Sequence, residues 1–362
     1  MFDFAVIGAG IAGASLAAEL APHGRVVILE AESQPGYHAT GRSAAFWSET
    51  YGGAGVQPLT TASGPALLAG GFLEPLGSLH IGRTGDRAAV DAFLEEFAGT
   101  SIALEEVDPS AIVPGLRAEW TLGVLEPSCA YIDVAGLHAD YLARARRAGA
   151  ILMTDAGLRT ARRTAGGWEI ETAAGPVAAR ALVNAAGAWA DDIARRAGVA
   201  PLGIRAYRRT MAQLRTEPAG PDRLPHVAAI DGSFYFKPEA GGKLWLSPHD
   251  EIETDPCDAQ PEEIDVAIAI DRFEQAVDWR VAAVERKWAG LRSFAPDRLP
   301  VYGFDARMEG FFWFAGQGGF GIQTAPAAAM LASALITGDL PNRALAGIDP
   351  ARYSPARRGL RR

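Results

Sequence analysis

Three glycines near the N-terminus have the spacing of a dinucleotide-binding turn. They are Gly8, Gly10 and Gly13, and they directly follow the apolar run at residues 4–7. In such a turn the first glycine permits a sharp bend, the second lets a pyrophosphate approach the backbone, and the third lets a helix pack closely on a strand. Glu30 ends the next apolar run, about 20 residues further on, where a carboxylate can bind ribose hydroxyls. The spacing predicts a dinucleotide site; the alternative is an Ala- and Gly-rich helix packed tightly on a sheet.

Two strands and a helix are expected to hold this turn. Residues 4–7 and 25–29 are short apolar runs, and the Ala-rich stretch 11–20 lies between them without interruption. Strands that are covered on both faces look continuously apolar, so these segments predict a β-α-β unit. Similar patterns predict a helix at 134–147, strands at 151–153, 177–184 and 311–315, a hairpin beginning at 168, and a helix at 322–336.

The stretches between these elements have a different character. Residues 47–133 and 205–287 carry more proline, more aromatic residues and alternating patterns that are typical of antiparallel strands, as at 235–238 and 244–247. We therefore expect an α/β protein with two interleaved domains. The first is a Rossmann-like nucleotide domain at 1–46, 134–204 and 288–362, and the second is a mostly antiparallel β-sheet substrate domain at 47–133 and 205–287.

Composition narrows the class of protein. The chain has 362 residues and a formal net charge of −9, which is the wrong sign for a nucleic-acid partner. Cys129 and Cys257 lie far apart and form no CxxC pair, which predicts reduced thiols in a cytoplasmic protein and no metal site. The apolar run at 325–336 is too short for a transmembrane segment, and Asp3 stands where a signal peptide would carry basic residues.

A second segment indicates how far the dinucleotide extends. Residues 38–45 are small and polar, contain Gly41, and precede what reads as the start of a helix. Such a segment can lie along the rest of a long, firmly bound dinucleotide. Taken alone, Arg42 would more often be a solvated surface residue.

In order along nearly the whole chain, these motifs resemble the D-amino-acid oxidase superfamily of FAD-dependent oxidoreductases. Within that superfamily the sequence is similar to the bacterial D-arginine dehydrogenases. The segments that carry the resemblance are residues 8–13 with Glu30, 41–45, 182–189, 233–238, 288–294, 296–303 and 316–323.

The resemblance implies FAD bound in an extended form and without a covalent bond, because neither cysteine lies near the C-terminal strands where some relatives attach the flavin. The glycine-rich turn at 318–322 would lie by the flavin ring, where N–H groups can stabilise negative charge on the reduced flavin. The alternative for that stretch is an ordinary turn. The implied cofactor-binding residues are Gly8, Gly10, Ala12, Gly13, Glu30, Ala31, Thr40, Gly41, Arg42, Ser43, Ala44, Ala45, Leu158, Ala186, Gly187, Trp189, Arg292, Gly318, Gly319, Phe320, Gly321, Ile322 and Gln323.

The resemblance also indicates which residues bind the substrate. Arg292 and Arg209 are implied to bind a carboxylate, a task that suits the planar guanidinium. Tyr235 and Tyr51 are implied to donate hydroxyl hydrogen bonds to the same group. Plainer alternatives are that Arg208 takes this role instead, that the adjacent arginines form a solvated pair, or that the tyrosines only pack. The implied substrate-pocket residues are Phe46, Ser48, Ser78, His226, Ala228 and Gly319.

The expected side-chain pocket departs from the D-arginine dehydrogenase pattern. Ser78 stands where an acidic residue is expected, and Phe46, beside Trp47, replaces a histidine. A guanidinium buried there would lose its water without gaining a counter-charge, unless Glu49 or Glu74 supplied one. A neutral or apolar substrate side chain is therefore favoured.

The predicted activity is oxidation of a small D-amino acid. Hydride would pass from Cα to flavin N5, and the imino acid would then hydrolyse to a 2-oxo acid and ammonia, with no protein base required. The alternatives are a glycine- or sarcosine-type amine oxidase, a 2-hydroxy-acid dehydrogenase, and a flavin-binding subunit without activity of its own. The electron acceptor is expected to be oxygen, a quinone or an electron-transfer protein, and the protein to be cytoplasmic or peripheral to the inner membrane.

Overall fold

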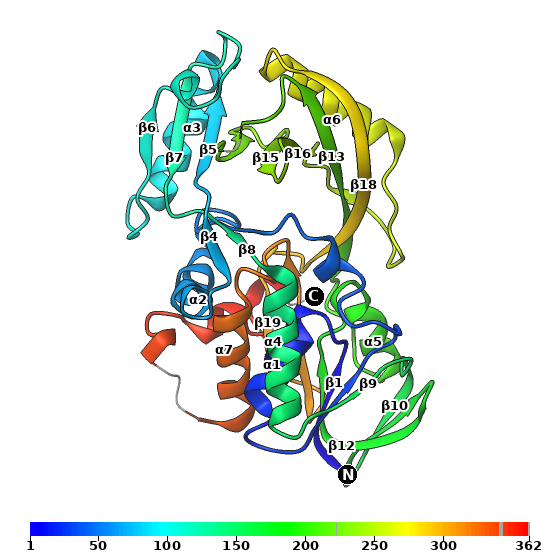
Figure 1. Cartoon of the computed structure of the whole chain (residues 1–362). Helices are drawn as coiled ribbons and strands as arrows, with labels where there is room; N and C mark the ends of the chain where they lie inside the picture. The colour runs from blue at the N-terminus through cyan, green and yellow to red at the C-terminus, as the bar shows by residue number, and fades with distance from the viewer. Residues whose placement is uncertain (222, 340–342, 361–362) are drawn as a thin grey trace.

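The computed structural model describes residues 1–221, 223–339 and 343–360. They form two stacked parts, with the N-terminal segment in the lower part of Figure 1 and a mostly antiparallel sheet in the upper part. In the lower part β1 (Phe2–Ile7) lies parallel to β2 (Val26–Leu29), and α1 (Ile11–Leu20) connects them. The predicted β-α-β unit and the α/β fold class are therefore confirmed.

The lower sheet is centred on β1, which has parallel neighbours on both sides. In order across the sheet, the strands are β10 (Leu158–Thr164), β11 (Gly167–Thr172), β12 (Gly175–Asn184), β1, β2 and β9 (Ile151–Met153), with β20 (Phe311–Ala315) beside β12 and β19 (Val301–Phe304) beside β20.

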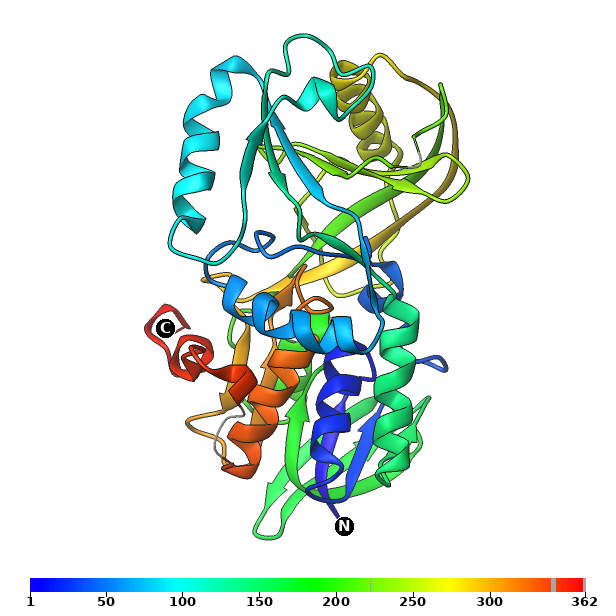
Figure 2. The same cartoon turned by 60° about the vertical axis from the view of Figure 1, so that its left-hand side comes forward.

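Both faces of this sheet are covered, which explains its continuously apolar central strands. Val6 of β1 packs in the cluster that contains α1, α4 (Val134–Arg147) and α7 (Ala325–Thr337). Its neighbours Ala5 and Ile7 pack on the other face, with α5 (Ala190–Arg196). Figure 2 shows α1, α4 and α7 side by side on one face. The helices predicted at 11–20 and 134–147 are confirmed at both ends.

Two predicted helix starts are wrong. The helix expected from residue 322 begins at Ala325, after a turn, with Pro326 in its first turn. A proline is favoured there because the missing N–H would have no partner within the helix. The helix expected to start directly after residues 38–45 does not form. A short 3₁₀ turn at Ala39–Arg42 leads instead into extended backbone, and Ala45 has a φ of 56°, which a right-handed helix excludes.

The upper sheet is organised by two long strands, β13 (Arg205–Glu217) and β18 (Arg280–Phe294), which pair antiparallel over almost their whole length. Both run down to the junction with the lower part (Figure 1). α6 (Glu263–Ala276) packs on this sheet, where Phe273 is fully buried. The strand order is β21 (Gln317–Gly318), β18, β13, β16 (Lys243–Ser247), β15 (Tyr235–Glu239), β14 (His226–Ala229), β5 (Ser78–Gly82), β7 (Leu122–Glu126) and β6 (Glu105–Val107), with β17 (Ile252–Glu253) beside β13.

A small sheet of β3 (Phe46–Trp47), β8 (Ala130–Ile132) and β4 (Leu73–Pro75) lies at the junction of the two parts (Figure 1). The proposed domain division remains a proposal: β18 crosses its boundary at 287–288, and residues 340–342 and 361–362 of its last segment lie outside the described residues. Within the described ranges, no helix is long and apolar enough to cross a membrane. The remaining α-helices are α2 (Gln57–Ala69) and α3 (Arg87–Phe97) among the described residues.

Candidate active site

A cavity of about 500 Å³ runs from the N-terminal glycine turn to the junction of the two sheets. Most of the residues predicted to bind the cofactor line it, although they come from distant parts of the chain. They are Gly8, Gly10, Ala12, Glu30, Ala31, Thr40, Arg42, Ser43, Ala44, Ala45, Leu158, Ala186, Gly187, Trp189, Arg292, Gly318, Gly319, Gly321, Ile322 and Gln323.

Gly13, Gly41 and Phe320 were also predicted to bind the cofactor but do not line the cavity. A Cβ on Gly13 would overlap the carbonyl oxygen of Gly8, so this glycine serves the close packing of helix on strand. A Cβ on Gly41 would lie 2.9 Å from the carbonyl oxygen of Gly36. Phe320 packs behind the wall, its ring centroid 5.0 Å from that of Tyr51. These three residues therefore lie behind the residues that line the cavity.

The glycine turn has the geometry of an anion site at the start of α1. Gly8 has a φ of 98°, which favours glycine, and a Cβ there would lie 2.8 Å from the carbonyl oxygen of Ala185. The hydroxyl of Thr40 accepts the N–H of Ile11 at 2.9 Å, which ties the segment after β2 to the first turn of α1. Helix N-termini with close glycine backbone attract phosphate groups, so this end of the cavity suits a pyrophosphate.

The carboxylate of Glu30 is fixed beside the turn. One of its oxygens accepts the N–H of Ala9 at 2.7 Å, and the other accepts the N–H of Glu32 at 2.9 Å. The side chain is held at the cavity wall, and its remaining lone pairs can accept hydrogen bonds from ribose hydroxyls.

Arg42 lines the cavity, but its guanidinium is engaged by the protein. It forms an ion pair with Asp258 and donates to the carbonyl oxygens of Ala259 at 3.0 Å and Ala289 at 3.1 Å. Arg42 therefore ties the segment around residue 258 to the cofactor segment. Cys257, beside this ion pair, also lines the cavity.

The two candidate carboxylate-binding arginines lie on one face of the upper sheet. In the register of β13 and β18, Arg209 pairs with Gly290 and Tyr207 pairs with Arg292. Paired residues share a face, and so do residues two apart along a strand, so Arg209 and Arg292 project to the same side. Arg208 projects to the other side, where it pairs with Asp265 at 2.8 Å and with Glu262. The structure therefore brings Arg209, and not Arg208, to the cavity.

Both arginines keep a buried N–H group that has no hydrogen-bond partner within the described part of the chain. These are Nη1 of Arg209 and Nε of Arg292. Burial, and then the charge of Arg292, lowers the pKa of Arg209 from its usual value. An unpaired buried guanidinium N–H is costly, so this end of the cavity suits an anion that accepts from both groups.

The two tyrosines also reach this end. The hydroxyl of Tyr51 and Nε of Arg292 lie 2.5 Å and 2.6 Å from the position that a Cβ on Gly319 would take, so both border the same small space. The Tyr235 hydroxyl contacts Sδ of Met211 at 3.1 Å, and burial raises the pKa of Tyr235. The Tyr51 hydroxyl therefore borders the space beside Arg292, and Tyr235 lies near enough for the charges of Arg209 and Arg292 to act on its hydroxyl.

Phe46 closes the side of the cavity next to these groups. Its ring stacks on His226, with centroids 4.5 Å apart, and lies 5.1 Å from the ring of Tyr51. Ser78 and His226 bond to each other at 2.9 Å, and both are buried. Burial lowers the pKa of His226 well below its usual value, so the ring is neutral.

Four predicted substrate-pocket residues are therefore not at the cavity surface. His226 lies behind the Phe46 ring that stacks on it, Ser78 is bonded to His226, and neither of the two lines the cavity. Ala228 follows His226 on β14 and does not line the cavity either. Ser48 turns its hydroxyl to the buried carboxylate of Glu126, at 2.8 Å. Of the predicted pocket, Phe46 and Gly319 remain at the cavity surface.

Sequence reasoning missed Met211, Glu126 and Glu251. Met211 follows Arg209 by two residues on β13 and lines the cavity, a position that strand alternation could have indicated. Glu126 accepts hydrogen bonds from the hydroxyls of Ser48 and Thr50, and Glu251 forms ion pairs with both Arg292 and Arg209. These acids come from distant strands and loops, so no local signal marked them. The described residues contain no cluster suited to a metal ion.

The fold and the cavity define a nucleotide-binding flavoenzyme, and the comparison with protein families agrees. The chain belongs to the DAO family of FAD dependent oxidoreductases, whose model matches residues 3–335. The glycine turn, the fixed Glu30 carboxylate and a cavity that reaches from them to the arginines fit FAD in an extended form.

Relatives with known activities include glycine oxidases. The glycine oxidase of Pseudomonas aeruginosa is 27% identical over 388 residues, which cover 98% of each chain. The crystal structure of glycine oxidase from Geobacillus kaustophilus superposes with a TM-score of 0.83 over 98% of each chain, at 24% identity. The L-proline dehydrogenase structure from P. horikoshii has a TM-score of 0.84 at 20% identity over 98% of this chain and 96% of that one. At these identities, the two structures show that the fold is shared and nothing more.

Mitochondrial dimethylglycine dehydrogenase is another relative. The mouse protein is 27% identical over 387 residues, which cover 96% of this chain. The chain spans only 44% of the length of that relative. None of these relatives is a D-arginine dehydrogenase. The predicted similarity to that group stays a prediction.

We expect FAD to be bound without a covalent bond. The purified protein should be yellow, and acid precipitation should release FAD into the supernatant, because Cys129 is buried away from the cavity. Cys257 is exposed and lines the cavity, so Cys257→Ser is the matched control. Colour that stays with the pellet in the parent protein and leaves it in Cys257→Ser would contradict the prediction, and so would FMN in the supernatant.

Proposed function

We propose that this protein oxidises the Cα–N bond of a small amino acid of the glycine type, with glycine or an N-methylated glycine as substrate. One observation carries the proposal: Arg209 and Arg292 line the same end of the cavity as Tyr51 and Phe46, and each keeps a buried N–H group without a partner among the described residues. Nε of Arg292 and the Tyr51 hydroxyl border one small space beside Gly319. A carboxylate satisfies these donors, and the closed side leaves room for a small Cα substituent.

The residues act chiefly by holding the substrate. Arg292 and Arg209 bind the carboxylate, and the hydroxyls of Tyr51 and Tyr235 donate to it, which fixes the position of Cα. The chemistry that bound FAD would supply here is acceptance of two electrons and the Cα hydrogen. Loss of the Cα hydrogen with two electrons turns the Cα–N bond of the neutral amine into the C=N bond of an iminium ion, which loses an N–H proton where the nitrogen carries one. Water then hydrolyses it to a 2-oxo acid and the free amine. At this end of the cavity the described lining residues contain no carboxylate or imidazole, so the amine must be neutral when it reacts.

The relatives support this choice of substrate. Their names state action on glycine and dimethylglycine, which share a carboxylate and lack a side chain. A second candidate is a small neutral D-amino acid, favoured by the apolar surfaces of Phe46 and Met211 at the cavity wall and by the neutral His226 behind them. The same wall opposes D-arginine, because no carboxylate of the described residues lines the cavity beside Phe46 and Met211 to pair with a buried guanidinium.

Phe46 is expected to set the size limit. In Phe46→Ala the ring no longer separates the cavity from His226, so kcat/KM for D-leucine or D-norvaline should rise by roughly 10-fold or more, since each methylene in a pocket contributes about 1–3 kcal/mol. Glycine, which gains no contact, should react no faster than before. The control Phe304→Ala removes an exposed ring at the far edge of the lower sheet. An equal change for glycine and D-leucine in Phe46→Ala would show that Phe46 does not select by size.

Product analysis tests the proposed function. The purified chain is supplied in turn with glycine, sarcosine, dimethylglycine, D-alanine, D-arginine and D-lactate, each with oxygen and then with an artificial electron acceptor. Glyoxylate with ammonia from glycine, or with methylamine from sarcosine, supports the proposal. Preference for D-arginine contradicts the neutral pocket, and preference for D-lactate indicates a hydroxy-acid dehydrogenase. A protein that contains FAD but turns over nothing alone would be a flavin-binding subunit.

A further inference from the structure

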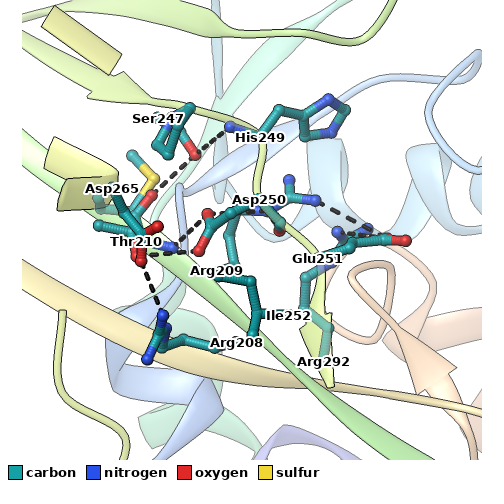
Figure 3. A network of polar contacts seen from close by, with 12 residues as sticks. Arg208, Arg209, Thr210, Ser247, His249, Asp250, Glu251, Ile252, Asp265 and Arg292 are labelled. Atoms are coloured by element: carbon teal, nitrogen blue, oxygen red, sulfur yellow. Dashed lines mark hydrogen bonds and ion pairs between the residues drawn. The ribbon is translucent and has the colours of Figure 1, made fainter. Parts of the chain in front are cut away.

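The loop after β16 brings a carboxylate to the arginine pair. Oε1 of Glu251 accepts from Nη1 of Arg292 at 2.9 Å. Nη2 of Arg298 bonds to both oxygens of Glu251, at 2.7 Å and 2.9 Å. Nη2 of Arg209 lies 3.8 Å from the same carboxylate. Figure 3 shows Glu251 in one network with Arg209 and Arg292.

Glu251 and the cavity lie on different edges of the Arg292 guanidinium. Nη1 points to Glu251, whereas Nε and Nη2 lie 2.6 Å and 2.9 Å from the position that a Cβ on Gly319 would take. The Nε–Nη2 edge is one of the two edges with which arginine binds a carboxylate in paired hydrogen bonds. The contact with Glu251 thus leaves this edge turned to the cavity.

Neighbouring groups do not replace Glu251 in this contact. The carboxylate of Asp250 is held instead by the N–H of Thr210 at 2.7 Å and by its hydroxyl at 2.9 Å. Burial, followed by the charges of the arginine pair, lowers the pKa of His249 to about 3, so that ring is neutral near pH 7. The charged and titratable groups that face Glu251 are Arg209, Arg292, Arg298 and His249. Asp250 precedes it in the chain, and its carboxylate lies 3.8 Å from Nε of Arg209.

Glu251 carries its negative charge at neutral pH. Burial alone would raise the pKa of this carboxyl, but the charges of Arg292, Arg298 and Arg209 outweigh burial and lower it. Arg298, whose guanidinium carbon lies 3.9 Å from the ring centroid of Phe294, fixes the carboxylate from the outer side.

We propose that Glu251 is a positioning residue that presents the Nε–Nη2 edge of Arg292 to the substrate carboxylate and offsets part of the positive charge beside the flavin. The proposal rests on the proposed function of the same site. Two properties follow from it, and they can be separated by substitution. The hydrogen bond to Nη1 sets the orientation of Arg292, and the negative charge sets the potential felt by the substrate amine and by the flavin.

Glu251→Gln and Glu251→Ala test these properties. The amide oxygen of Gln can still accept from Nη1 but carries no charge, whereas Ala removes both. Binding of acetate, a carboxylate without an amine, is measured from the change in the flavin absorption spectrum, together with FAD content, melting temperature and flavin midpoint potential. Glu253→Gln is the matched control, because Glu253 lies two residues further on and pairs with the exposed Arg205.

We expect Glu251→Gln to bind acetate about 3- to 10-fold more tightly, since a more positive site favours an anion. Its midpoint potential should rise, and the rising limb of the pH–rate profile should move to lower pH, because added positive charge favours both the reduced flavin and the neutral amine. Glu251→Ala should bind acetate at least about 10-fold more weakly than Glu251→Gln. If Glu251→Ala does not fold, the flavin midpoint potential and the pH–rate profile of Glu251→Gln decide whether the proposal holds.

The inference is overturned if Glu251→Gln and Glu253→Gln match the parent protein in acetate affinity, midpoint potential and pH profile. Its failure is distinguishable from failure of the proposed function. Equal acetate binding in all variants, with flavin reduction by glycine in the parent, removes only the role of Glu251. The expected shifts without reduction by any amine would keep the role of Glu251 in anion binding and remove the proposed substrate class.

Discussion

Replacing Arg292 by methionine is expected to lower kcat/KM for the preferred amino acid by about 30- to several-thousand-fold, while FAD stays bound. A carboxylate that loses its charged partner in a buried site typically loses about 2–5 kcal/mol of interaction. Arg292 supplies the guanidinium edge that faces the space beside Gly319 and Tyr51. Methionine keeps much of the apolar stem but cannot donate a hydrogen bond.

The comparison needs a control for the general loss of a positive charge. Arg205→Met serves, because Arg205 is exposed at the start of β13 and pairs with Glu253, away from the carboxylate site. Steady-state kinetics, the visible spectrum and the melting temperature are measured for both variants. Near-normal kinetics in Arg292→Met with an intact flavin spectrum would remove this residue from the site.

Gly319→Ala is expected to abolish most turnover, by about 100-fold or more, because a 1 Å displacement of a binding group can cost that much. The new Cβ would lie 2.5 Å from the Tyr51 hydroxyl and 2.6 Å from Nε of Arg292. The protein can relieve these contacts only by moving the two side chains that are proposed to bind the carboxylate. The backbone of Gly319 has no positive φ, so the substitution brings no backbone strain.

The effect should therefore fall on kinetics and not on cofactor content. Gly99→Ala is the matched control, because a Cβ there meets nothing within 4 Å. FAD content is measured from the spectrum after acid release, and acetate affinity from the flavin absorption change. If Gly319→Ala binds FAD and acetate like the parent and turns over within threefold of it, the small space beside Gly319 is not the carboxylate site.

The helices whose ends are marked by neighbouring residues could be predicted from the sequence. The helix at 11–20 was predictable because it follows a glycine turn and consists of helix-forming, mostly apolar residues. The helix at 134–147 was predictable because Gly149 follows its end. The start of the last helix was placed too early, at residue 322, because Ile322 and Gln323 suit a helix in isolation. In the structure they form a turn that lines the cavity.

The candidate site depends on strand register and on contacts between distant segments, which the sequence alone does not show. The choice between Arg208 and Arg209 follows from which face of β13 each occupies, and that needs the register with β18. The family resemblance indicated Ser78 and His226, but it could not indicate that the Phe46 ring lies in front of them. Glu251 reaches Arg292 across 41 residues of chain, through the packing of a loop against a strand.

The most direct test of the central claim is anaerobic mixing of the purified protein with single amines while the oxidised flavin absorption is followed. We predict that glycine or an N-methylated glycine bleaches the flavin, that D-leucine does so more slowly, and that Arg292→Met loses the fast phase. Bleaching by D-lactate alone, or by no amine in a protein that contains FAD and is reduced by dithionite, would contradict this prediction.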